Sequence, residues 1–137
     1  MSGNNFTSVG LDKFVLELRD NAILEELILD NNNFSGRQIT CLANLFSDTQ
    51  SLKKFSAEKC EMDEFAGESI KNGLMRNMTL LELYLKENSL YDAGCAFICQ
   101  ALSSNTCLKK IDLSENRFRE KSGVAIGSML KANTTLE

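Results

Sequence analysis

The chain has 137 residues, of which 43% are hydrophobic and 25% are charged, and its formal net charge is −4. This length suits one domain with a hydrophobic core, and the acidic balance argues against a nucleic-acid-binding protein, which usually needs a basic surface. The sequence contains no histidine, so the commonest general base and metal ligand is missing.

The predicted elements follow the chain in a repeating order. Residues 1–23 read as a partial repeat that ends in a helix, and a leucine-rich strand segment, "LEELILDNNNF", then begins at Leu24. Similar segments begin at Leu52, Leu80 and Leu108, always at the same interval and without insertion, and a fifth begins at Leu136. We therefore expect a single domain over residues 1–137, with repeats at 24–51, 52–79, 80–107 and 108–135 and the start of another at 136.

Within each repeat the spacing of apolar residues changes. In the repeat 80–107, Leu83 and Leu85 alternate with polar residues, which is typical of a short strand with one buried face. After a turn, Cys95, Ile98 and Leu102 recur at intervals of three and four, which predicts a helix from about residue 92 to residue 104. Strands joined by helices run parallel, so stacked repeats would bury one continuous core.

The strand segments resemble the leucine-rich repeat, L-x-x-L-x-L-x-x-[N/C]-x-L, if Phe55, Ala57 and Ile111 count as apolar substitutes. The 28-residue period with a full helix is similar to the ribonuclease-inhibitor subclass of this family. The resemblance implies an α/β fold: a right-handed, curved solenoid with parallel strands on the concave face and helices on the convex face. It covers essentially the whole chain.

The ends of the chain fit the same period. A shift of one period back from Asn32 and Phe34 reaches Asn4 and Phe6, so "SGNNF" reads as the tail of an earlier strand. Neither end shows a dedicated polar cap, which terminal repeats normally supply. We expect either a segment of a longer solenoid or a protein that covers its ends by self-association.

Asparagine recurs directly after the strands, at Asn32, Asn88 and Asn116, and Cys60 replaces it once. We expect these amides to bond buried backbone groups, which cost about 1–3 kcal/mol each when unsatisfied. The five cysteines form an odd set without close pairing, and Cys95 and Cys99 lie on one helix. Without histidine they do not suggest a zinc site, so we expect no metal and no cofactor.

No apolar run has the length of a membrane span, and the polar N-terminal residues lack the core of a signal peptide. Together with the unpaired cysteines, this favours a cytoplasmic location.

The residues between the buried strand positions would face outward on the concave side. The first outward column, Glu26, Lys54, Glu82 and Lys110, alternates in sign, and like positions on parallel strands lie about 4.8 Å apart. We expect it to be a self-neutralising ladder. The next column places Ile28 and Tyr84 on the outside, and an exposed tyrosine flanked by charges is typical of an interface.

These patterns predict a non-catalytic module that binds a protein partner, and neither nucleic acid nor membrane, through the concave face and the adjoining turns. The first residues to test are Ile28, Tyr84, Lys86, Asp112 and Glu115. The alternative is a GTPase-activating regulator resembling the Ran GTPase-activating protein, in which Arg117 or Arg119, in a turn after a strand, would stabilise phosphoryl-transfer charge. No phosphate loop, nucleophile motif or zinc-helix motif supports an enzyme.

Overall fold

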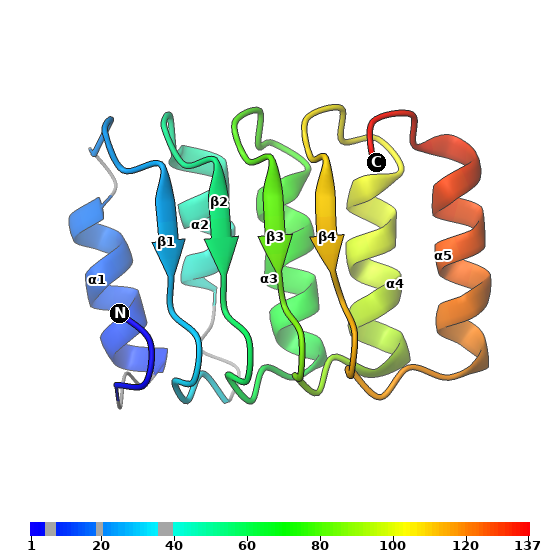
Figure 1. Cartoon of the computed structure of the whole chain (residues 1–137), viewed down its shortest axis with the longest axis horizontal. Coiled ribbons are helices and arrows are strands. Elements are labelled where there is room, and N and C mark those ends of the chain that lie inside the picture. Colours follow the sequence, from blue (N-terminus) through cyan, green and yellow to red (C-terminus); the bar gives the residue numbers. More distant parts are fainter. Residues whose placement is uncertain (5–7, 19–20, 36–39) are drawn as a thin grey trace.

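Strands and helices alternate along the whole chain in the computed structural model, which describes residues 1–4, 8–18, 21–35 and 40–137 (Figure 1). Within these residues the order of elements is α1 (Ser8–Leu18), β1 (Glu26–Ile28), α2 (Cys41–Asp48), β2 (Lys54–Ser56), α3 (Glu64–Leu74), β3 (Glu82–Tyr84), α4 (Tyr91–Leu102), β4 (Lys110–Asp112) and α5 (Glu120–Ala132). The predicted helix at residues 92–104 is α4, displaced by one or two residues.

The four strands form one parallel sheet in chain order, β1-β2-β3-β4. Its register follows the period of the sequence, so that Leu27, Phe55, Leu83 and Ile111 lie in one row across the sheet. The structure therefore confirms the predicted α/β solenoid of strand–helix repeats.

The helices cover one face of the sheet, and neighbouring helices lie farther apart than neighbouring strands (Figure 1). The difference has a simple physical cause, because packed helices need about 8–10 Å between their axes and hydrogen-bonded strands only about 4.8 Å. The stack must curve toward its narrower side. The strands consequently line the concave face.

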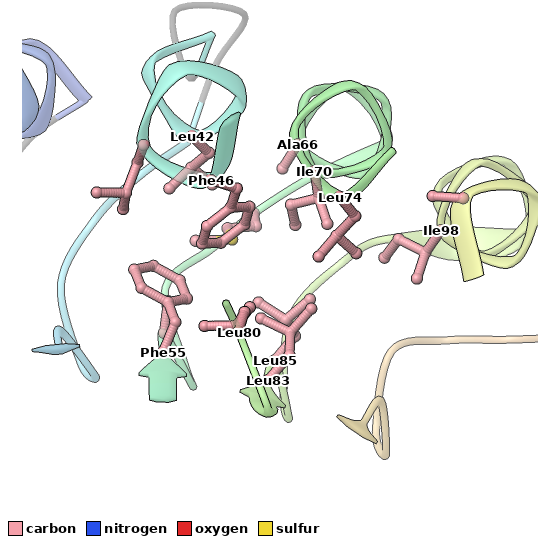
Figure 2. Close-up of a cluster of buried hydrophobic side chains, with 14 of the residues drawn as sticks. Leu42, Phe46, Phe55, Ala66, Ile70, Leu74, Leu80, Leu83, Leu85 and Ile98 are labelled. Atoms are coloured by element: carbon pink, nitrogen blue, oxygen red, sulfur yellow. The ribbon is translucent and has the colours of Figure 1, made fainter. Parts of the chain in front are cut away.

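The core lies between the sheet and the helices (Figure 2). Leu80, Leu83 and Leu85 from the β3 segment are fully buried, as predicted. They meet a helix layer that includes Ile70 and Leu74 of α3. The ring of Phe46 packs edge-on against Phe55, with 5.1 Å between the ring centroids and 83° between the planes.

Burial decreases at both ends of the stack. Leu24 is the first leucine of the repeat pattern and therefore a predicted core position, but it is only half-buried, whereas the equivalent Leu52 and Leu80 are buried. Leu130 of α5 is exposed, although the equivalent Leu74 and Leu102 are buried. In the described part of the chain, β1 pairs only with β2 and α5 packs only against α4, so each of these side chains lacks one neighbouring repeat.

Residues 1–4 continue the hydrogen-bonding pattern of the repeats. The amino group of Met1 donates to the carbonyl oxygen of Ile28 at 3.0 Å, and the amide of Gly3 donates to that of Asp30 at 2.8 Å. Leu29 and Asn31 donate in the same way to the next repeat. Residues 1–4 thus bond to the β1 segment in the way that one repeat bonds to the next, while Asn5 and Phe6 of "SGNNF" lie outside the described residues.

The asparagine column satisfies buried backbone groups, as predicted. The Nδ2 atom of Asn88 donates to the carbonyl oxygens of Ala57 and Leu85, both at 2.9 Å. Its Oδ1 atom accepts from the amides of Cys60 and Met62, both at 3.0 Å. One side chain thus connects two consecutive repeats. In the same column, Cys60 uses its thiol to donate weakly, at 3.3 Å, to the carbonyl oxygens of Leu29 and Glu58.

A second asparagine column, at the helix-to-strand connections, has an equivalent role. Asn77 donates to the carbonyl oxygen of Phe46 at 2.7 Å, and Asn105 donates to that of Leu74 at 3.0 Å. The sequence shows this column, but its periodicity alone does not indicate the bonds. Each of these two connections is therefore fixed to the repeat before it.

Candidate protein-interaction surface

The first outward column on the concave face is the predicted ladder of alternating charges. The Nζ atom of Lys54 lies 2.7 Å from Glu26, and that of Lys110 lies 3.6 Å from Glu82. The hydrogen bond from Lys54 to Glu26 raises the pKa of the lysine. These groups are paired with each other, so this column offers little net charge to a ligand.

Tyr84 is the aromatic residue of the second outward column and is held in place by its neighbours. Its hydroxyl group donates to Glu82 at 3.0 Å, and this bond raises the pKa of the tyrosine. The Nζ atom of Lys54 lies 5.7 Å from the ring centroid, within the range of a cation–π contact. Tyr84 is half-buried rather than fully exposed.

Ile28 shares this column but lies two strands from Tyr84, and Ser56 stands between them. Ile28 is half-buried, and Ser56 is only 5% exposed, with its hydroxyl group donating to Asp30 at 2.6 Å. The two apolar side chains are therefore separate features of the concave face.

The strand ends and the turns that follow them carry an excess of acidic groups. We call this region the acidic rim. The charged side chains that form it are five carboxylates and two lysines, namely Asp30, Glu58, Glu87, Asp112, Glu115, Lys59 and Lys86. Lys86 lies 3.2 Å from Glu115, and Lys59 lies 3.2 Å from Glu87. Burial and the neighbouring Asp30 and Asp112 raise the pKa of Glu58, which indicates a concentration of negative charge.

Four of the five predicted interface residues are neighbours. Tyr84 pairs in register with Asp112 on the adjacent strand, and Lys86 bonds Glu115 just beyond them. Asp112 accepts from the amide and the hydroxyl group of Ser114, and these bonds lower the pKa of its carboxyl group. Sequence reasoning identified these outward positions, and it also placed Asp30 and Glu58 outward but did not count them among the candidate interface residues. Summing the charges in each outward column would have shown the excess of acidic groups.

The two arginines considered for a GTPase-activating role make structural contacts. The guanidinium of Arg117 donates to the hydroxyl group of Tyr91 at 2.8 Å and lies 5.6 Å from the centre of that ring. The backbone amide of Arg119 donates to Asp92 at 2.9 Å, where it helps to fix the start of α5. Neither contact gives a specific indication of phosphoryl transfer.

The cysteines are unpaired and mostly buried. The sulfur atoms of Cys95 and Cys99 lie 3.9 Å apart inside α4, and their hydrogen bond, together with burial, raises the pKa of Cys99. Among the described residues, no group of three potential ligands is arranged to hold a metal ion. Within the same residues, no helix has the length and apolar character needed to cross a membrane.

Comparisons with known proteins identify the relatives of this chain. Two models described as "Leucine Rich Repeat" and "Leucine Rich repeat" match residues 23–45 and 104–127. Ribonuclease inhibitor from Sus scrofa is 33% identical over 123 residues, which cover 88% of this chain and 27% of the relative. NACHT, LRR and PYD domains-containing protein 12 from Mus musculus is 32% identical over 88% of this chain and 12% of its own length. The chain therefore spans about a quarter or less of these relatives.

Two solved structures share the fold. A structure titled "Leiomodin-1 Actin-Binding Site 2 (ABS2)" superposes with a TM-score of 0.80 at 23% identity and covers 92% of this chain and 75% of its own. The tropomodulin C-terminal domain from Caenorhabditis elegans superposes with a TM-score of 0.79 at 13% identity, covering 91% and 78%. At these identities the likeness concerns the fold alone. The family-model matches and the ribonuclease inhibitor relatives identify the chain as a leucine-rich-repeat protein of the ribonuclease-inhibitor-like subclass.

Proposed function

We propose that this chain is a protein-interaction module that binds its partner through the concave face and the adjoining turns, without catalysing a reaction. The observation that carries the proposal is the grouping of Tyr84, Lys86, Asp112 and Glu115 on two adjacent strands and their turns. The relatives agree with such a role. One of them is named as an inhibitor of ribonuclease, and one similar structure is titled as an actin-binding site.

The charge of the acidic rim favours a basic segment of the partner. Opposite charges accelerate encounter and select the orientation of binding, while contributing less to affinity than a buried anchor does. The anchor on this face would be Tyr84, because its hydroxyl group and ring are already positioned by Glu82 and Lys54. An ordered tyrosine loses little conformational freedom on binding and supplies a large contact area.

Site-specific photo-crosslinking tests the proposal. A photoreactive phenylalanine analogue is placed at Tyr84 in one variant and at Gln100, an exposed residue on the helical face of α4, in another. Both variants are irradiated in extracts of cells that produce the protein. The proposal predicts one defined adduct from position 84 that is absent from position 100 and is suppressed by an added excess of the unlabelled protein.

Adducts of the same size and yield from both positions would contradict the proposal. So would an adduct formed from position 100 alone. In either case the partner would contact the helical face.

A further inference from the structure

The connection between α3 and β3 carries three exposed apolar side chains. Met75 is 57% exposed, Met78 is 78% exposed and Leu81 is 38% exposed. All three fall within the short segment 75–81, at the edge of the solenoid where each helix leads into the next strand (Figure 1). This edge lies opposite the acidic rim, because it adjoins the starts of the strands rather than their ends.

The other repeats show that the fold does not need apolar residues at these positions. Asn77 and Asn105 anchor their connections through equivalent hydrogen bonds, so the backbone follows the same path in both repeats. Yet the equivalent positions in the other repeats are polar or charged with one exception, the small residue Ala22; the polar and charged ones include Ser47, Ser103, Gln50, Thr106, Glu25, Lys53 and Lys109. The connections at 47–53 and 103–109 therefore serve as an internal control. They form without apolar side chains at the positions equivalent to 75, 78 and 81.

Exposed clusters of this kind mark contact surfaces more often than isolated apolar residues do. Methionine suits such a surface, because its unbranched, polarisable side chain adapts to different partner shapes. A partner that covered these side chains would remove apolar area from water at a gain of about 25 cal/mol per Å². We call Met75, Met78 and Leu81 the α3–β3 patch.

Charged groups border the α3–β3 patch, and Leu81 lines one hollow together with Glu25, Glu26, Lys53, Lys54 and Glu82. The amide of Leu81 donates to the carbonyl oxygen of Lys53 at 2.7 Å, and the amide of Lys109 donates to that of Leu81 at 2.8 Å, so a lysine lies on each side. Lys109 has a partner in Glu137 at 3.7 Å. Among the described residues, no carboxylate lies within ion-pair distance of Lys53 or of Arg76, which adjoins Met75 and is exposed.

We propose that the α3–β3 patch, at the edge of the solenoid opposite the acidic rim, is a second docking surface for a partner-protein segment that combines apolar side chains with carboxylates. The apolar side chains would cover the methionines and the leucine, and the carboxylates would pair with Lys53 and Arg76. A partner protein fits better than an anionic membrane, because the net charge of −4 on the chain opposes approach to a negative lipid surface.

A display library of random linear peptides provides the test. Peptides are selected on the wild-type chain, and their affinities are then measured for Met75→Ser/Met78→Thr, which installs the side chains of Ser103 and Thr106, and for Tyr84→Ala. The proposal predicts a class of peptides rich in leucine, isoleucine or phenylalanine together with aspartate or glutamate. This class should bind the double variant at least about tenfold more weakly and Tyr84→Ala equally well, as expected when one or two methionines leave an interface.

The proposal is overturned if every selected peptide keeps its affinity for the double variant, or if the peptides that lose affinity are basic. It is also overturned if phosphatidylserine-containing vesicles sediment with the wild-type chain and not with the double variant, since the patch would then serve a membrane. Circular dichroism of both variants confirms that they fold. Peptides that respond to Tyr84→Ala alone report on the concave face, so the failure of either proposal is recognised separately.

Discussion

Gly67 of α3 lies directly against Gly94 of α4. A Cβ atom added to Gly67 would stand 2.5 Å from the Cα atom of Gly94 and 2.8 Å from its carbonyl oxygen. Both of these are backbone atoms, which cannot move aside as a flexible side chain does. The spacing between the two helices therefore depends on the absence of a side chain at position 67.

Replacing Gly67 by alanine should destabilise the chain by about 1–3 kcal/mol, because the added methyl group forces α3 and α4 apart. The matched control is Gly127→Ala in α5, where an added Cβ atom meets nothing within 4 Å. That change should stabilise the chain by about 0.5–1 kcal/mol through helix propensity. Urea unfolding of both variants measures the difference, and a shift of the same sign in both would contradict the packing described.

Asn88→Ala should cost about 2–4 kcal/mol, since it removes the partners of two buried carbonyl oxygens and two buried amides. The control, Asn72→Ala, changes the same residue type on the exposed side of α3 and should alter the free energy of unfolding by no more than about 0.5 kcal/mol. Denaturant unfolding compares the two variants. Equal effects would mean that the asparagine column does not connect the repeats.

Asp92 should contribute stability that depends on pH. The hydroxyl group of Ser122 and the backbone amides of Arg119 and Ser122 donate to its carboxylate, and these bonds hold its pKa below the ordinary value. A group with a lowered pKa stabilises the folded state above its unfolded pKa, about 3.9 for aspartate, and this contribution is lost as the pH falls through the folded pKa. The wild-type chain should therefore be more stable than Asp92→Asn near neutral pH, and the gap should close below about pH 4. A gap that stays constant over thermal melts from neutral to acid pH would show that the charge of Asp92 is not involved.

Leu83 and Tyr84 are adjacent in β3 but lie on opposite faces of the sheet. Leu83→Asp should unfold or aggregate the chain, because it places a charge without a partner in the centre of the core. Tyr84→Ala should change the thermal midpoint little, since the tyrosine contacts mainly the surface groups Glu82 and Lys54. Thermal unfolding followed by circular dichroism ranks the two variants. If Tyr84→Ala were the more disruptive change, the assignment of the two faces would be wrong.

The strand register could be predicted from the sequence because the repeat has no insertion. Residues that occupy the same position in successive repeats become a row of the sheet, as Leu27, Phe55, Leu83 and Ile111 show. The burial of a column could not be predicted equally well at the ends of the stack. Leu130 occupies the same column as Leu74, but Leu130 is exposed and Leu74 is buried. Burial at such a position depends on whether a neighbouring repeat covers it and not on the residue itself.

The candidate surface was only partly predictable for a similar reason. Outward positions follow from strand alternation, so Tyr84, Lys86 and Asp112 could be identified from spacing alone. How they are arranged depends on contacts between repeats, such as the bond of Lys86 to Glu115 in the following turn. The proximity of Gly67 and Gly94 likewise has no periodic signal, because the two residues do not share a column.

The measurement that most directly tests binding by the concave face compares two identical substitutions on opposite sides of the solenoid. Glu115→Lys alters the acidic rim, and Glu68→Lys makes the same charge change on the exposed side of α3. The affinity of each variant is measured for the partner captured by crosslinking at position 84. We predict that Glu115→Lys weakens binding by about tenfold or more, equivalent to about 1.4 kcal/mol, while Glu68→Lys stays within about twofold of the wild-type chain. Equal affinities for the two variants, or a larger loss with Glu68→Lys, would contradict the concave face as the binding surface.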